Sequence, residues 1–459
     1  MAFPTILFNV ASGSDTAASG SGPTTALSGT AASYSGSVFT LDGTPDLSGV
    51  ATDGTHLIWV QTSTGRQFFT INAVDDGADT VTVDDAPAGT TTGLTWGLGG
   101  KRNSLDNADN RLLFSAADLK GGWIVELEDD QTLTSGLVCA AAGYAMIRGA
   151  SEHVVINQTS SNTPIFTSLI AEYVFSSLKF TNSHVTKGSN SVAFYFQSGG
   201  VARVKIDNCI FGDATNQLYS ANYRNSSGAQ VWISDCEIAH CTNNGWNRHS
   251  GYSGALYMER CWVHDNSSVG VFLLYGDKCH ITHCTITDNG GDGIGFYGNS
   301  SSQRNMPFIT NCTIDGNASE GIQLSDDYYP QHAVIDNNII SNNGTYGIAS
   351  TYTASEPALL LKSVRNNNIY NNTSGQFSGI DETLGFAFSG NISVDPGFTD
   401  AAGGDYSVGE NMKAVGLPLT SRTIGANQSA TKSYVDIGAA QRQESAGGAT
   451  RLINGGLIS

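Results

Sequence analysis

The stretch CHITHCTITDN, residues 279–289, decides the fold of this chain. Its apolar residues Cys279 and Ile281 alternate with polar ones, and Cys284 and Ile286 alternate again after a short break. Alternation with a period of two is the pattern of a β-strand that buries one face. The stretch therefore predicts two short strands joined by a turn.

The same pattern recurs along the chain, and aligning the repeats gives two columns. The first column holds cysteine and then asparagine at intervals of 23 to 29 residues: Cys209, Cys236, Cys261, Cys284, Cys312, Asn338 and Asn367. Five residues further on, the second column reads Ala214, Cys241, Asn266, Asn289, Asn317, Asn343 and Asn372. Each repeat then continues with a glycine and an apolar residue, as in Gly293-Ile294 and Gly321-Ile322.

Short strands joined by asparagine and glycine turns predict a coil of β-strands. Its rungs stack about 4.8 Å apart, so equivalent residues form ladders along the coil. A buried asparagine in such a ladder can form hydrogen bonds with its neighbours above and below. We therefore expect the cysteine column to face the interior as buried free thiols, with a disulfide or a metal site as the alternatives, and the asparagine column to be buried and hydrogen-bonded.

These repeats resemble those of the right-handed parallel β-helix superfamily, the pectate-lyase-like fold. The resemblance is clear over residues 204–380 and extends weakly back to about residue 112, and the segment DPGFTDAAGGDYSV (395–408) looks like a closing segment of that superfamily. It implies an all-β chain with an N-terminal β module for attachment and capping (1–110), a right-handed β-helix (111–395), and a C-terminal cap and tail (396–459). The superfamily contains lyases, glycosidases, esterases, adhesins and phage tailspikes, so the resemblance specifies a fold more than an activity.

Composition narrows the possible partners. The chain of 459 residues has 22 Lys and Arg against 41 Asp and Glu, a net charge of −19, so we expect no nucleic acid and no anionic membrane as a partner. No stretch is apolar for 18 residues, and MAFPTILFNV (1–10) lacks the basic start of a signal peptide. We therefore expect neither a transmembrane helix nor a signal peptide.

Two carboxylates in adjacent repeats are the best candidates for catalysis. Asp292 and Glu320 each stand three residues after the asparagine column, and Asp326 and Asp327 are second choices. Stacked carboxylates repel each other, which raises one pKa as a general acid requires. A separation of one strand spacing would favour a retaining glycosidase mechanism.

Aromatic and polar residues near these carboxylates predict a carbohydrate-binding groove. The candidates are Arg248, His249, Phe272, Tyr275, Tyr297, Gln323, Tyr328 and Tyr329. The alternative is a solvated turn face with surface tyrosines. A second column of Asp213, Asp265 and Asp288, completed by His240, is interpreted as turn residues, with a calcium site as the alternative. No metal and no other cofactor is assigned.

The resemblance favours a bacteriophage virion surface protein, a tailspike or an adhesin or decoration protein, whose β-helix engages host surface polysaccharide. It implies a homotrimer, and outward aromatic residues such as Trp262 and Phe272 would be covered by a neighbouring subunit. The N-terminal module would contact other virion proteins. The alternatives are a polysaccharide lyase or glycoside hydrolase, acting by β-elimination or hydrolysis, and a purely structural virion protein, so enzymatic activity stays open.

Overall fold

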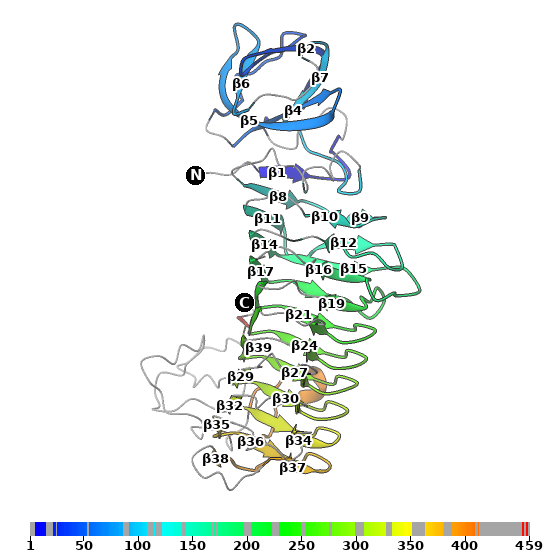
Figure 1. Cartoon of the computed structure of the whole chain (residues 1–459), viewed down its shortest axis with the longest axis vertical. Helices are drawn as coiled ribbons and strands as arrows, with labels where there is room; N and C mark the ends of the chain where they lie inside the picture. The colour runs from blue at the N-terminus through cyan, green and yellow to red at the C-terminus, as the bar shows by residue number, and fades with distance from the viewer. Residues whose placement is uncertain are drawn as a thin grey trace.

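The protein is elongated, with a small β-barrel at one end of a long stack of strands (Figure 1). The computed structural model describes residues 5–14, 22–23, 25–52, 55–85, 91–107, 114, 122–139, 144–167, 169, 172–196, 203–222, 229–248, 254–274, 278–298, 307–326, 333–350, 363–380, 388–408, 412, 452–453 and 456–457. No helix within these ranges is long and apolar enough to cross a membrane.

Three parallel sheets form the stack. The first sheet has 12 strands: β1 (Thr5–Phe8), β8 (Trp123–Leu127), β11 (Tyr144–Gly149), β14 (Glu172–Ser176), β17 (Arg203–Asp207), β20 (Gln230–Ser234), β23 (Ala255–Glu259), β26 (Lys278–Thr282), β29 (Pro307–Thr310), β32 (Val334–Asp336), β35 (Ser363–Arg365) and β38 (Phe388–Ser389). The second sheet has ten: β9 (Gln131–Leu133), β12 (Val154–Gln158), β15 (Leu178–Asn182), β18 (Ile210–Phe211), β21 (Glu237–Ala239), β24 (Trp262–His264), β27 (Thr285–Thr287), β30 (Thr313–Asp315), β33 (Ile339–Ser341) and β36 (Asn368–Tyr370).

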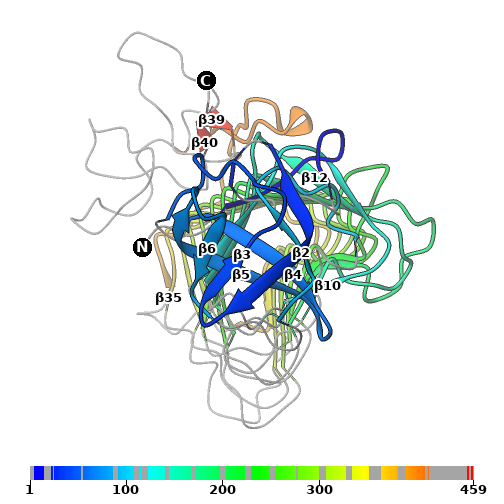
Figure 2. The same cartoon turned by 90° about the horizontal axis from the view of Figure 1, so that it is seen from above.

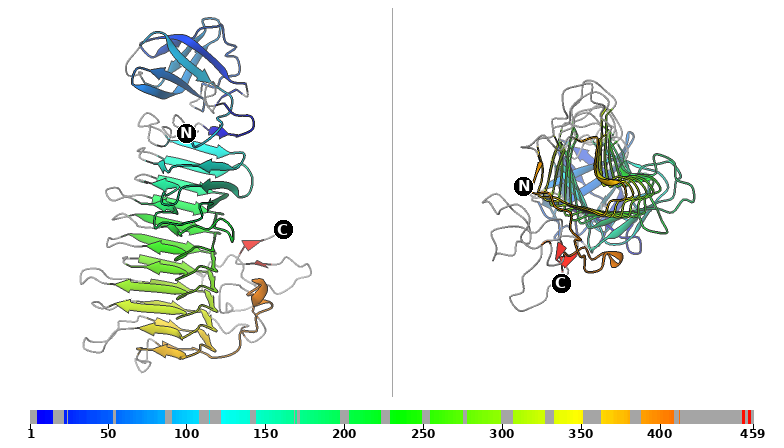
Figure 3. Two further views of the ribbon diagram at one scale, coloured as in Figure 1. Left: turned by 90° about the vertical axis from the view of Figure 1, so that its right-hand side faces the viewer. Right: turned by 90° about the horizontal axis from the view of Figure 1, so that it is seen from below.

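The third sheet also has ten strands: β10 (Leu137–Val138), β13 (Phe166–Thr167), β16 (Val192–Tyr195), β19 (Ser220–Asn222), β22 (Trp246–Arg248), β25 (Val271–Leu273), β28 (Ile294–Gly298), β31 (Ile322–Asp326), β34 (Tyr346–Ser350) and β37 (Gly375–Ser378). From β8 onwards, successive strands of the chain enter the first, second and third sheets in turn, so each rung gives one strand to each sheet. Seen from below, the rungs enclose a narrow interior (Figure 3). The predicted parallel β-helix is confirmed.

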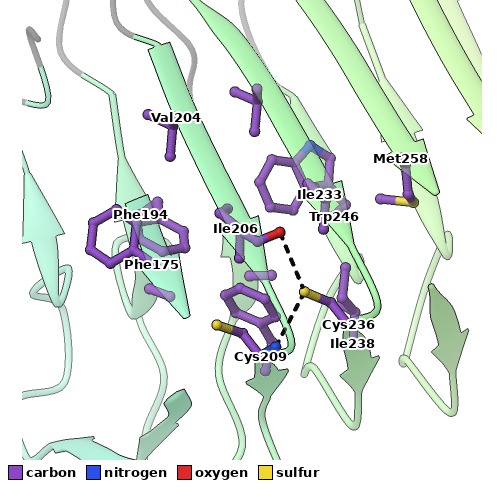
Figure 4. Close-up of a cluster of buried hydrophobic side chains, with 14 of the residues drawn as sticks. Phe175, Phe194, Val204, Ile206, Cys209, Ile233, Cys236, Ile238, Trp246 and Met258 are labelled. Carbon is purple, nitrogen blue, oxygen red and sulfur yellow. Dashed lines mark hydrogen bonds between the residues drawn. The ribbon is translucent and has the colours of Figure 1, made fainter. Parts of the chain in front are cut away.

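The interior is one continuous apolar core because alternate residues of each strand point inward. In β23, Leu256 and Met258 are buried while Tyr257 between them is half-buried and faces outward. The five cysteines of the predicted column are buried free thiols within this core. The Sγ of Cys236 lies 3.4 Å from the backbone nitrogen of Cys209 and 3.8 Å from the carbonyl oxygen of Ile206 (Figure 4).

The turn between the second and third sheets is built on the predicted asparagine ladder. Asn266 Nδ2 donates to Asn289 Oδ1 at 2.9 Å, and the same bond links Asn289 to Asn317 at 2.9 Å and Asn317 to Asn343 at 3.0 Å. The glycine at the start of the next strand is required here: a Cβ on Gly270 would lie 2.8 Å from Asn289 Nδ2. The buried ladder therefore confirms the sequence prediction for this column.

The N-terminal barrel contains β2 (Leu27–Ser35), β3 (Val38–Thr40), β4 (Leu57–Thr62), β5 (Gly65–Asp75), β6 (Thr80–Val83) and β7 (Leu94–Leu98). Its residues Trp59 and Phe68 belong to the same buried cluster as Phe8 and Trp123 of the first rung. Figure 2 shows the barrel over the end of the stack. The barrel therefore covers the apolar end of the β-helix, as an end of a solenoid requires.

Strand β1 precedes the barrel in the chain but belongs to the β-helix. It pairs in parallel with β8, with Thr5 opposite Ile124 and Phe8 opposite Leu127. The segment 1–110, expected to form one module, is thus divided between the first sheet and the barrel.

Residues 394–408 fold back along the outer face of the second sheet as a hairpin (Figure 3). Its tip is a 3-10 turn, Ala401–Gly403, and a Cβ on the following Gly404 would lie 3.0 Å from the Trp262 ring. Tyr406 Oη donates to Asp288 Oδ2 at 3.2 Å. Trp262 faces outward as expected, but the chain's own C-terminal segment lies against it. The short strands β39 (Leu452–Ile453) and β40 (Gly456–Leu457) pair further on.

Candidate functional site

Asp292 and Glu320 lie on adjacent rungs in register, at the turn that leads into the third sheet. The N–H of Gly293 donates to the carbonyl oxygen of Glu320 at 2.9 Å, which aligns the two turns. Asp292 Oδ1 accepts a bond of 3.3 Å from the backbone N–H of Glu320. The structure thus brings the two predicted carboxylates together.

Tyr297 is the main partner of Asp292. Its hydroxyl donates to Asp292 Oδ2, and its ring lies back along β28 over Gly295. A Cβ on Gly295 would meet the Tyr297 ring at 2.3 Å, so this position needs a glycine for the ring to reach the carboxylate. Phe272 of the neighbouring strand stacks on Tyr297, with ring centroids 4.8 Å apart and planes inclined by 22°.

The environment sets the two carboxylates to different pKa values. Burial, with the carboxyl group of Glu320 next to it, raises the pKa of Asp292 to about 6, although the bond from Tyr297 opposes the shift. Burial also raises the pKa of Glu320, but hydrogen bonds with Ser319 and Asp292 outweigh that effect and the net shift is downward. Two carboxyl groups with pKa values moved apart are the pattern of an acid and base pair.

The carboxyl group of Glu320 interacts with that of Asp292 and raises its pKa, as expected for neighbouring like charges. Retaining glycosidases hold their two carboxyl groups about 5–5.5 Å apart, with the sugar between them. Here Asp292 is 5% exposed and Glu320 is half-buried. A carboxyl group as buried as that of Asp292 suits proton transfer more than nucleophilic attack.

The outer face of the third sheet carries one column that crosses the site: Asn247, Phe272, Gly295 and Gln323 are successive partners in register. Gln323 is 6% exposed and Asn247 is 3% exposed. Within the described ranges, Gln323 Nε2 and Asn247 Oδ1 have no hydrogen-bond partner.

Asn247, Gly295 and Ser319 were missed in the sequence. Asn247 stands two residues after Gly245, as Phe272 does after Gly270, so the column alignment contained the signal for it. Ser319 donates a hydrogen bond to Glu320, and nothing in the repeat distinguishes it from a turn residue.

The other predicted site residues are not placed by the structure. His249, Tyr275, Asp327, Tyr328 and Tyr329 lie outside the described residues. Arg248 and Asp326 end strands β22 and β31, and their side chains also lie outside the description. The described site therefore consists of the two carboxylates, the Phe272–Tyr297 stack and the column beside it.

The second acidic column does not form a single site. His240, Asp265 and Asp288 adopt positive φ angles of 51° to 55°, which marks them as turn residues. Each acid has its own partner: Asp213 pairs with Lys179 at 2.8 Å, Asp265 with His264 at 2.8 Å, and Asp288 with Tyr406. No group of three or more His, Cys, Asp or Glu side chains in the described ranges is arranged to hold a metal ion.

Comparison with known proteins identifies the repeat. Residues 170–306 and 303–392 match the family described as right handed beta helix region. This part of the chain is a right-handed β-helix. Its handedness agrees with the rule that parallel crossovers are right-handed, and the right-handed β-helix predicted for the central segment is confirmed.

Three solved structures are similar to this chain. The A-module of a mannuronan C-5 epimerase from Azotobacter vinelandii is 13% identical, over 63% of this chain and 97% of that one, with a TM-score of 0.36. A pectate lyase is 15% identical, over 70% and 88%, with a TM-score of 0.36. The catalytic domain of an α-1,3-glucanase in complex with nigerose is 11% identical, over 84% and 91%, with a TM-score of 0.35. No curated protein sequence matches the chain.

Proposed function

We propose that this right-handed β-helix binds a polysaccharide on the outer face of its third sheet. The observation that carries the proposal is the Phe272–Tyr297 stack beside the carboxyl groups of Asp292 and Glu320. Glu320 is half-buried, and its carboxylate can accept hydrogen bonds from sugar hydroxyl groups. Aromatic rings supply the apolar surface on which a sugar ring packs.

We further propose that the protein acts on the surface of a bacteriophage virion, where it engages host surface polysaccharide. The order of parts supports this: a compact barrel covers one end of the β-helix and leaves the lateral faces of the long stack to meet a ligand. The barrel would attach the protein to other virion proteins. A module before a β-helix is the organisation that the sequence resemblance to phage tailspikes implies.

A homotrimer belongs to the same proposal. Because Gly404 and Tyr406 lie along the Trp262 side of the second sheet, we expect subunit contacts on parts of the lateral faces that this segment and the saccharide site leave uncovered. Sedimentation equilibrium at micromolar concentration should give three times the chain mass of 48.1 kDa. A species of one chain mass would contradict the trimer without affecting the binding site.

Cleavage of the bound polysaccharide is the second candidate function. It is favoured by the buried acid of Asp292, whose raised pKa of about 6 leaves it half protonated at about pH 6, next to Glu320, whose pKa is lowered. A protonated carboxyl group can protonate the leaving oxygen of a glycosidic bond. Elimination and hydrolysis both need such proton transfers, so the Asp292–Glu320 pair is compatible with either reaction.

One experiment tests binding and cleavage separately. The parent and its variants are incubated with purified capsular polysaccharides and lipopolysaccharide O-chains from bacteria, and both retention and released reducing ends are measured. Tyr297→Ala should weaken retention at least tenfold, whereas Tyr370→Ala, on the second sheet, should leave it unchanged. The double variant Asp292→Asn with Glu320→Gln should retain the polysaccharide but release nothing.

The outcomes are distinct. Equal retention by the parent and Tyr297→Ala contradicts the binding site. Unchanged release by the double variant contradicts the catalytic assignment, and retention without release by the parent leaves the binding function alone.

A further inference from the structure

A groove lies on the outer face of the first sheet, on strands β14 to β23 and away from the third sheet. It has a volume of about 790 Å³. The residues that matter for its chemistry are Arg203, Lys205, Asp207, Trp232, Tyr257 and Glu259. None of them belongs to the site proposed above, which faces outward from a different sheet.

A stack of four rings leads into this groove. Trp232, Tyr257, His280 and Phe308 are successive partners in register on β20, β23, β26 and β29. Their ring centroids are 5.5, 5.1 and 4.7 Å apart and their planes are inclined by 7°, 24° and 7°. Rings at these distances are too close to lie side by side in one plane, so they stand face to face and cover one another.

Trp232 is the end of this stack. On the preceding rung its partner in register is Lys205, which has no ring to cover the remaining indole face. Trp232 is 36% exposed, the only tryptophan among the described residues with so large an exposed fraction. One face of a rigid indole is therefore supported by Tyr257 while the other is open to the groove.

Hydrogen-bond donors and acceptors both surround the open face of the Trp232 ring. Asp207 accepts a hydrogen bond from Ser234, and Arg260 binds Asp235 through two bonds of 2.8 and 2.7 Å while it also pairs with Glu259. Arg203 and Lys205 form no ion pair within the described ranges.

Positive and negative side chains are equal in number in the lining of the groove. Glu172, Asp207 and Glu259 face Arg203, Lys205 and Arg260, so the lining has three carboxylates and three cations on a chain of net charge −19. A neutral ligand rich in hydroxyl groups suits a lining that offers donors and acceptors together. An apolar partner would leave these charges without water or partners.

We propose that this groove is a second saccharide-binding site, in which a neutral hexose residue stacks on the open face of Trp232. Arg203 and Lys205 donate to its hydroxyl groups, and Asp207 and Glu259 accept from them. Concave sites with an aromatic surface and a few fixed polar groups are the general form of small-ligand sites. The proposal does not depend on the third-sheet site, because the two share no residue.

The test uses the full chain with the third-sheet site disabled by Phe272→Ala and Tyr297→Ala. This protein and a further Trp232→Ala variant are applied to an array of purified neutral and acidic bacterial polysaccharides, and Kd is measured by titration for each glycan that binds. We expect Trp232→Ala to raise Kd at least tenfold and Trp232→Phe to raise it less. Phe308→Ala removes the ring at the far end of the stack, so it should change Kd less than twofold.

Thermal unfolding of each variant establishes that it is folded. Equal Kd values for the parent background and Trp232→Ala overturn the proposal, as does the failure of the disabled background to bind any glycan. Binding confined to acidic glycans would overturn the neutral-sugar assignment. If Trp232→Ala instead dissociates an oligomer and leaves glycan binding intact, the groove is an interface between copies of the chain and the saccharide site is wrong.

Discussion

The side-chain nitrogen of Asn289 donates a hydrogen bond of 2.9 Å to the side-chain oxygen of Asn317 on the next rung. Asn289 Oδ1 also accepts from Asn266, and its Nδ2 bonds the carbonyl oxygen of Val263 at 3.2 Å. Because the side chain is 1% exposed, no water replaces these bonds if the amide is lost. The ladder therefore holds the turn of each rung to the turn of the next.

Replacing Asn289 should destabilise the β-helix. Asn289→Leu leaves buried groups on two rungs without partners, and we expect a loss of about 1–3 kcal/mol in the free energy of unfolding. Asn216→Leu, at a half-buried position, should change it by less than about 0.5 kcal/mol. Fast hydrogen exchange of the Asn289 side-chain amide in the parent protein would contradict the buried ladder.

A charge in the cysteine column should lower the free energy of unfolding more than the loss of Asn289 does. Cys261 is 0% exposed and packed among apolar side chains, so Cys261→Asp buries a carboxylate without a cation. We expect a loss of several kcal/mol, roughly 3 or more. Cys261→Ala removes only the sulfur and should cost much less. A melting temperature of Cys261→Asp equal to that of the parent would show that the column does not face the interior.

Asp292 should make the folded state less stable as pH rises. Its pKa is raised from 3.8 to about 6 on folding, so between these values the folded state binds more protons than the unfolded state. The contribution of this group is therefore present below pH 4 and lost as pH rises through about 6. The opposite shift of Glu320 offsets part of it, and we expect a net change on the order of 1–2 kcal/mol.

The variant Asp292→Asn isolates this effect because it cannot titrate but keeps an oxygen for the Glu320 N–H. Its free energy of unfolding relative to the parent should increase between pH 4 and pH 7, measured by urea denaturation at each pH. A difference that is constant across this range would mean that Asp292 has an ordinary pKa.

Removing the hydroxyl of Tyr297 should raise the pKa of Asp292 further. The bond from Tyr297 stabilises the charged carboxylate, so Tyr297→Phe should move the pKa of Asp292 above about 6. Gly295→Ala should act in the same direction, because its methyl group would displace the Tyr297 ring. Carbon-13 NMR of the aspartate carboxyl groups measures the pKa directly, with Tyr370→Phe as the control. A fall in either variant would contradict the assigned bond.

The rungs of the β-helix were predictable because each rung repeats the same local pattern. Alternation around Ile281 and Ile286 indicates the strands, and the spacing of Cys284 and Asn289 aligns one rung with the next. The closure of the barrel and the placement of 394–408 along the second sheet were not predictable in this way. Both depend on contacts between residues far apart in the chain, such as Tyr406 with Asp288, that leave no periodic signal.

The candidate sites show the same division. Asp292 and Glu320 could be paired from register alone, but the path of Tyr297 over Gly295 depends on side-chain conformation. The ring stack of the first sheet was present in the alignment, where Trp232 and Tyr257 occupy the residue between the two apolar positions of their strands. The sequence prediction was confined to the aromatic residues around the acidic turns and did not include this outward column.

The pairing of β1 with β8 has a consequence for synthesis and folding order. Neighbouring rungs connect residues that are close in the chain, such as Ile281 and Ile309, whereas Thr5 must wait for Ile124. Strand β1 therefore has no partner in the first sheet until the whole barrel and β8 have been made. Because contacts between distant residues form slowly, β1 is expected to pair with β8 late. Its pairing then fixes the barrel at the end of the β-helix.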